Sequence, residues 1–182
     1  MSKCSTNGAK ILHTGNAKSA TGMTKFESNI KFIQYPQEAV YAKLSDLTNL
    51  ESIKGRVSDP SFIEAVRASG QVPEDKLGQI QEAIQNLEFD RDSVTIQGSP
   101  LGAVSLHIIE RDAPKCIKFE TNNSPIQANL WIQLLPVSDL NCKMRCTIGA
   151  ELNFFMKQMA KKPLQEGVEK LADMLAMIPY GF

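Results

Sequence analysis

The spacing of hydrophobic residues changes three times along the chain. It alternates over residues 25–34, follows helical spacing over residues 36–87, alternates again over residues 93–150, and returns to helical spacing over residues 152–178. Alternation is typical of half-buried strands, because successive side chains of a strand point to opposite faces, whereas spacings of three and four are typical of helices. The pattern predicts a strand, then helices, then several strands, then one long helix.

Residues 152–178 form the longest of the predicted helices. Pro163 lies in its middle and predicts a kink, because proline lacks the backbone N–H and clashes with the preceding turn. The helix carries a broad apolar stripe that is rich in Met and Phe and needs an equally broad apolar partner, such as a sheet. The stripe consists of Leu152, Phe155, Met156, Met159, Leu164, Val168, Leu171, Ala172, Leu175 and Ile178.

Turn residues divide the second alternating region into five strands, as in consecutive antiparallel hairpins. These strands are predicted at 93–97, 103–110, 116–121, 128–135 and 142–150. Pro36, Asp59 and Pro73 are typical of helix starts and predict two or three short helices between the first strand and these five. We therefore expect an α+β fold, in which a curved antiparallel sheet of about six strands wraps around the long C-terminal helix.

The chain is expected to have a short tail and one domain. Residues 1–22 are predicted to be a disordered N-terminal tail, and residues 23–182 a single domain, which fits the length of the chain. The tail carries Lys3, Lys10 and Lys18 with no acidic residue, and it lacks the apolar stretch of a secretory signal. These features lead us to expect a cytoplasmic protein.

Composition limits the candidate functions. The 20 basic and 20 acidic residues balance, so no general attraction to nucleic acid is expected, although a local basic patch is compatible with this total. No apolar run approaches the ~20 residues of a membrane span. The two histidines and four cysteines show no metal-ligand spacing, and Cys142 and Cys146 would lie ~13 Å apart along a strand. We expect neither a metal nor a cofactor.

Three stretches of sequence, 24–53, 102–121 and 129–175, resemble a known family in their pattern and order. That family is the SRPBCC or START-like helix-grip superfamily, in its polyketide cyclase/dehydrase-like branch. The resemblance covers about residues 24–178 and includes no catalytic signature, and the helical part at 56–87 is longer than a minimal member needs. It implies a deep cavity between helix and sheet, which in this family often takes lipids, sterols, polyketides or other apolar molecules.

The alternation assigns side chains to the inner face of the predicted sheet, and none of them is Asp, Glu, His, Lys or Arg. A general acid or base requires such a group, so no catalytic residue is predicted. A slip of one residue would turn His107 or Trp131 inward, and Trp131 is either a cavity wall or a packing residue of the outer face. Phe32 is assigned to the inner face. We expect a cavity lined by Phe26, Ile30, Leu106, Phe119, Leu130, Ile132, Met144, Phe155, Met156 and Met159.

Three functions are compatible with these observations. The first is binding or transport of a hydrophobic, lipid- or polyketide-like small molecule, which an apolar inner face opposed by a Met-rich helix favours. The second is a cyclase- or dehydratase-type enzyme acting on an apolar substrate, which rests on the resemblance alone. The third is a protein-interaction module with a filled core, which an exposed apolar patch would favour. The expected partner is an unidentified apolar small molecule, and the sequence indicates no oligomeric state.

Overall fold

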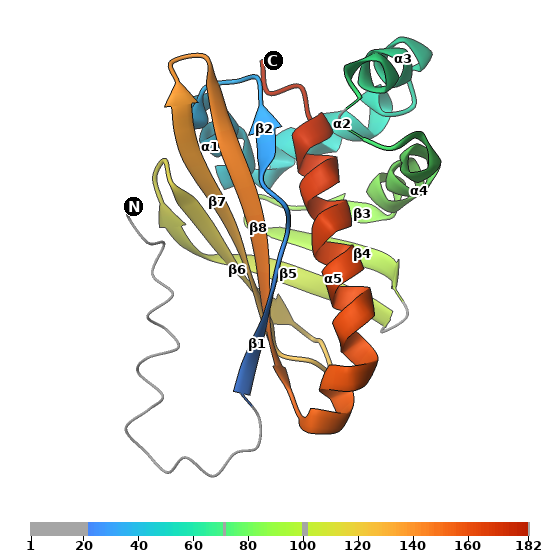
Figure 1. Ribbon diagram of the computed structural model, residues 1–182, viewed down its shortest axis with the longest axis vertical. Helices are drawn as coiled ribbons and strands as arrows, with labels where there is room; N and C mark the ends of the chain where they lie inside the picture. Colours follow the sequence, from blue (N-terminus) through green and yellow to red (C-terminus); the bar gives the residue numbers. More distant parts are fainter. Residues whose placement is uncertain (1–21, 71, 100–101, 182) are drawn as a thin grey trace.

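The computed structural model describes residues 22–70, 72–99 and 102–181 and shows an α+β fold (Figure 1). Its strands are β1 (Gly22–Glu27), β2 (Lys31–Ile33), β3 (Leu87–Phe89), β4 (Ser93–Ser99), β5 (Gly102–Asp112), β6 (Cys116–Asn122), β7 (Ala128–Ser138) and β8 (Asn141–Leu152). Its helices are α1 (Gln37–Ser45), the 3-10 helix η3 (Leu47–Leu50), α2 (Glu51–Arg56), α3 (Pro60–Ser69), α4 (Glu74–Gln85) and α5 (Phe154–Met177). The order of strand, helices, strands and long helix is as predicted.

All eight strands belong to one antiparallel sheet, in the order β1-β8-β7-β6-β5-β4-β3, with β2 also paired to β8. The helix α5 lies against β8, β1 and β2, and the shorter helices lie at one end of the molecule (Figure 1). The tail predicted at 1–22 lies outside the described residues, except for Gly22, which begins β1. The sheet has eight strands instead of about six, because the strand predicted at 25–34 is divided into β1 and β2 and because β3 is added.

The helical region is divided more finely than predicted. The first helix, predicted to start at Pro36, ends at Ser45, and the Asp46 carboxylate accepts a hydrogen bond from the Thr48 N–H to begin η3 as a separate element. The predicted start at Asp59 is observed, since its carboxylate accepts a hydrogen bond of 2.8 Å from the Ser61 N–H and caps α3. The described residues thus hold four short α-helices and one 3-10 helix between β2 and β3.

A bulge between β1 and β2 changes which side chains face inward. Glu27 pairs with Thr147 and Lys31 pairs with Met144, so three residues, 28–30, lie opposite only two residues of β8. One extra residue reverses the alternation that follows it. Ile33 is therefore buried, whereas Ile30 and Phe32 are exposed, which corrects the prediction that both face inward.

The helix α5 uses a narrower apolar stripe than predicted. Asn153 caps it by accepting a hydrogen bond from the Met156 N–H, and the helix continues through Pro163. Toward its start, only the series spaced by four residues packs against the core, and this series is Met156, Ala160 and Leu164. Toward its end the helix is covered more fully, with Val168, Ala172, Met174, Leu175 and Met177 buried.

An apolar cavity between the sheet and the helices

A cavity of about 110 Å³ lies between the inner face of the sheet, the helical segment that follows β2, and the second half of α5. Every described residue that lines it is apolar. From the helical segment and α5 these are Leu44, Leu47, Leu50, Ile53, Ile84, Leu171, Met174 and Leu175, with Ile178 just beyond α5. From the strands they are Leu87, Phe89, Val94, Ile96, Leu106, Phe119, Leu130 and Ile132.

Four of the ten side chains predicted for the cavity line it, and they come from the middle of the sheet. These are Leu106, Phe119, Leu130 and Ile132, on β5, β6 and β7. The register brings them together, because Phe119 pairs with Ile108 on one side and with Leu130 on the other.

The other six predicted side chains lie away from this cavity. Phe26 and Met144 are buried in other parts of the core, and Met156 is partly buried against it. Ile30, Phe155 and Met159 are exposed, which corrects their assignment as lining residues. The bulge at 28–30 turns Ile30 outward. Phe155 and Met159 each precede by one position a residue that faces the core, and one step along a helix rotates a side chain by about 100°.

The helical wall of the cavity was not predicted as part of a site. Leu44, Leu47 and Leu50 lie in the region of helical spacing at 36–87, but the sequence does not show where their side chains pack. Leu87 is the last residue of the region of helical spacing, and in the structure it instead begins β3. The helical region departs from the minimal family pattern between residues 56 and 87, and this length is a signal only for the lining residues Ile84 and Leu87.

The free cysteines of the described residues are not activated nucleophiles, and neither of them lines the cavity. Cys142 and Cys146 are free, buried thiols on β8. Burial raises the pKa of Cys142 to about 11 and that of Cys146 to about 12, so both thiols stay protonated near neutral pH. A protonated thiol is a poor nucleophile, so the site is not equipped for covalent catalysis through these cysteines.

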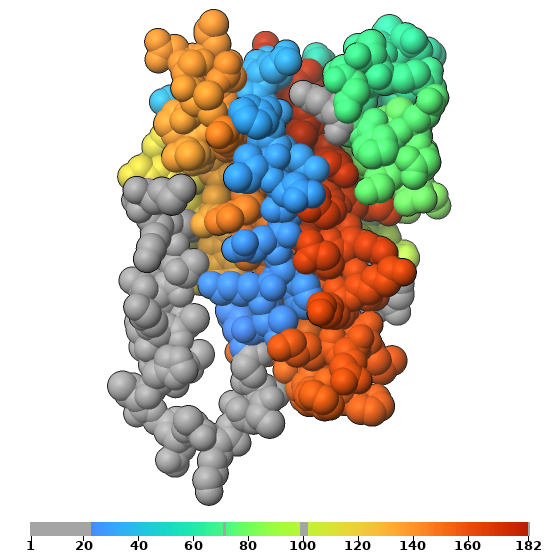
Figure 2. Space-filling model, viewed as in Figure 1, coloured from blue at the N-terminus to red at the C-terminus, as the bar shows by residue number. Residues whose placement is uncertain are grey.

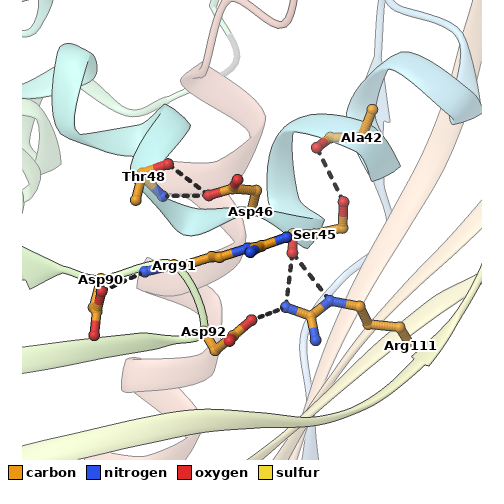
Figure 3. Close-up of polar contacts among 8 residues, drawn as sticks. All are labelled: Ala42, Ser45, Asp46, Thr48, Asp90, Arg91, Asp92 and Arg111. Carbon is orange, nitrogen blue, oxygen red and sulfur yellow. Dashed lines mark hydrogen bonds and ion pairs between the residues drawn. The ribbon is translucent and has the colours of Figure 1, made fainter.

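Arg111 ties the helical wall to the sheet (Figure 3). Its guanidinium group donates hydrogen bonds of 3.0 and 2.9 Å to the Ser45 carbonyl at the end of α1, and it forms an ion pair with Asp92. Close by, the Leu47 N–H donates to the Arg91 carbonyl at 3.0 Å. Leu44 and Leu47, which flank this junction, line the cavity. The polar junction therefore holds one wall of the cavity against the turn between β3 and β4.

Arg111→Ala is expected to loosen that wall. The carbonyl of Ser45 would lose two charged donors, so we expect a loss of about 1 kcal/mol in the free energy of unfolding and faster hydrogen exchange of amides 44–50. Hydrogen exchange with mass spectrometry measures this locally. Arg67→Ala, which removes exposed ion pairs with Glu64 and Glu74, is the control and should leave the segment protected. Equal protection of amides 44–50 in both variants would contradict the role given to Arg111.

Trp131 lies on the opposite face of the sheet from the cavity and is buried there. The Lys25 and Lys118 ammonium groups lie 5.7 and 5.4 Å from its ring centroid, and Met23 packs against it. A Cβ added at Gly149 would lie 2.9 Å from a carbon of the indole ring, so glycine is needed there for close packing. Of the two roles considered for Trp131, the structure shows packing on the outer face.

The described ranges contain neither a metal-binding group of side chains nor a membrane-spanning helix. Within residues 22–70, 72–99 and 102–181, no group of three or more His, Cys, Asp or Glu side chains could hold a metal ion. In the same part of the chain, no helix combines the length and the hydropathy required to cross a membrane.

Comparisons with known proteins identify the fold. No family model and no curated protein sequence matches the chain. Solved structures do match: norcoclaurine synthase from Thalictrum flavum, with a TM-score of 0.56 at 10% identity, covers 86% of both chains. A START superfamily protein from Mycobacterium smegmatis has a TM-score of 0.52 at 10% identity and covers 85% of this chain and 95% of that one. A solution structure from Thermobifida fusca has a TM-score of 0.52 at 12% identity, over 86% and 93% of the two chains.

The chain therefore has the SRPBCC or START-like helix-grip fold, as the sequence resemblance predicted. Identities near one residue in ten establish the fold alone. What the chain does has to be argued from its own cavity.

Proposed function

We propose that the chain binds an apolar small molecule in the cavity between the sheet, the helical segment and α5. The observation that carries this proposal is the wholly apolar lining of that cavity. A concave apolar site favours a ligand that gains free energy by leaving water. The fold supports the proposal, because it is shared with a START superfamily protein and with an enzyme named for a small-molecule synthesis.

The size of the cavity limits the ligand. An engineered apolar cavity of about 150 Å³ holds benzene. The present cavity, at about 110 Å³, has room for a single ring or a short branched chain. A lipid- or polyketide-like ligand would therefore require one wall to move outward. The helical wall fits this role better than the continuously paired sheet, because it consists of short elements joined to the sheet through Arg111.

Binding or transport is favoured over catalysis. A general acid or base has to come within hydrogen-bond distance of the substrate, and no described residue of the lining carries an ionisable group. The free thiols of Cys142 and Cys146 on β8, which do not line the cavity, have raised pKa values and stay protonated near neutral pH. No feature of this cavity favours a cyclase or a dehydratase.

Filling the cavity tests the proposal. Leu106→Trp places a large ring among the lining residues, and we expect at least a roughly tenfold loss of affinity for toluene, which matches the cavity in size and chemistry. Saturation-transfer NMR with toluene measures the affinity. Ile109→Trp is the matched control, since Ile109 is on the same strand and is exposed.

The outcomes separate clearly. Binding by the unchanged chain and by Ile109→Trp, together with loss of binding in Leu106→Trp, supports the proposal. The absence of saturation transfer to the unchanged chain, or equal affinities in the two variants, would refute it. Melting temperatures of both variants show whether a loss of binding comes from unfolding instead.

A further inference from the structure

The first half of α5 exposes large apolar side chains that the cavity does not use. Phe154, Phe155 and Met159 are 75%, 74% and 71% exposed. Phe155 and Met159 are four residues apart, so they lie on the same side of the helix, one turn from each other. Every residue that α5 contributes to the cavity lies at or beyond Leu171. Exposed apolar side chains that gather on one element indicate an interaction surface.

Basic side chains surround these apolar groups. Lys157, Lys161 and Lys162 are exposed on the same helical segment. No acidic residue occurs between residues 152 and 165, and the nearest ones along the chain are Glu151 and Glu166. Lys162 and Glu166 form only a long ion pair, of 3.9 Å. We call Phe154, Phe155, Lys157, Met159, Lys161 and Lys162 the basic apolar patch.

The basic apolar patch lies at one end of the molecule, beside the start of β1. Gly22, at the start of β1, pairs with Leu152, two residues before α5 begins. Figure 2 shows the start of α5, in orange, forming the end of the molecule opposite the β7–β8 hairpin.

We propose that this end docks on the surface of an anionic lipid bilayer. Phenylalanine and methionine side chains enter the boundary between headgroups and acyl chains, while the lysines meet the negative headgroups, as in helices that lie on a membrane. A second copy of the chain is a poorer occupant. A symmetric contact through the same patch would bring two sets of three lysines together, which like-charge repulsion opposes. The proposal does not depend on the ligand of the cavity.

Flotation of the full-length chain with vesicles tests the docking. The vesicles are phosphatidylcholine alone or phosphatidylcholine mixed with phosphatidylserine, at low and at high salt. We expect the chain to float with the phosphatidylserine vesicles, to float less at high salt, and to bind phosphatidylcholine alone weakly. Failure to float with phosphatidylserine vesicles at low salt would overturn the proposal.

Two sets of variants separate the apolar and basic contributions. Phe155→Ser combined with Met159→Ser is expected to weaken binding at least roughly tenfold, because the inserted groups are lost. Its control is Leu140→Ser, at the hairpin on the opposite end, where the side chain is equally exposed. Changing Lys157, Lys161 and Lys162 to Gln should remove the preference for phosphatidylserine. Changing the exposed Lys76 and Lys115 to Gln should leave it intact.

Further outcomes decide between occupants. Equal binding by the patch variants and their controls would overturn the proposal. So would light scattering that shows a dimer dissociated by Phe155→Ser with Met159→Ser, if vesicles capture no protein, because the patch would then belong to a second copy. The cavity variant Leu106→Trp is expected to float like the unchanged chain, so failure of the proposed ligand function and failure of membrane docking give different results.

Discussion

Lys31→Met is expected to lower the free energy of unfolding by about 3 kcal/mol, because it leaves a buried carboxylate without its cation. The Lys31 ammonium lies 2.7 Å from a carboxylate oxygen of Asp173 and 3.3 Å from one of Glu169. Asp173 is only 3% exposed and cannot replace the lost partner with bulk water. Urea unfolding followed by circular dichroism measures the change.

The double variant Lys31→Met with Asp173→Leu isolates the cause. It removes the unpaired charge together with its partner, and we expect it to recover most of the lost stability. Lys162→Met is the surface control, since Lys162 and Glu166 are both largely exposed, and its expected effect is below about 0.5 kcal/mol. If Lys31→Met lowers the free energy of unfolding by no more than Lys162→Met does, the buried ion pair does not have the stabilising role given to it.

The same ion pair makes stability depend on alkaline pH. Burial lowers the pKa of Lys31, but hydrogen bonds and charges from Asp173 and Glu169 outweigh it, so the pKa is raised above its ordinary value of 10.5. The folded state therefore holds this proton more tightly than the unfolded state does. Its contribution is complete below pH 10.5 and is lost as the pH rises through the raised pKa. The stability difference between the unchanged chain and Lys31→Met should shrink in that range.

Phe119→Ala is expected to destabilise the fold by about 3 to 4 kcal/mol while enlarging the cavity. Phe119 is 2% exposed and lines the cavity. It is on β6, which pairs with β5 on one side and with β7 on the other. Without the ring, the folded state loses the free energy that is gained when the ring leaves water. It also loses the contacts of the ring with neighbouring side chains. Because the space left is apolar, ligands larger than toluene should bind this variant better than the unchanged chain. Stability and affinity are thus expected to move in opposite directions.

Phe155→Ala is the matched control for Phe119→Ala, since it deletes the same ring at a position that is 74% exposed. Its expected effect on the free energy of unfolding is within about 0.5 kcal/mol. Urea unfolding and saturation-transfer NMR measure stability and affinity for both variants. A similar decrease in the free energy of unfolding in the two variants would show that Phe119 is not part of a closely packed core.

The middle of the sheet was predictable from sequence because its alternation is unbroken where the cavity forms. Leu106, Phe119, Leu130 and Ile132 occupy alternate positions on three neighbouring strands, and the observed register keeps them on one face. The prediction for Ile30 is wrong for a physical reason, because the extra residue at 28–30 reverses which side chains face the inside of the sheet. Ser28 and Asn29 are common in turns, but they also fit the alternation of residues 25–34, so the sequence does not mark the bulge in advance.

The errors in the prediction for α5, and the failure to predict the helical wall, have a different cause. Apolar residues occur around much of the start of α5, so spacing alone could not tell Phe155 and Met159 from Met156, which faces the core. The direction of the helix relative to the sheet decides this, and that direction depends on tertiary packing. The cavity residues Leu44 and Leu47 depend in the same way on the hydrogen bonds of Arg111, which join positions 66 residues apart in sequence.

Trp131 is the only tryptophan of the chain, and its indole lies on the face of the sheet away from the cavity. Its fluorescence therefore reports the packing of that outer face. Unfolding exposes the ring and separates it from Met23 and the two lysines, which should shift the emission to longer wavelength. A ligand that fills the cavity without moving the sheet leaves these neighbours in place, so binding is spectroscopically silent at this residue. Intrinsic emission would thus measure stability without interference from ligand occupancy in a cavity variant that adds no second tryptophan, such as Phe119→Ala.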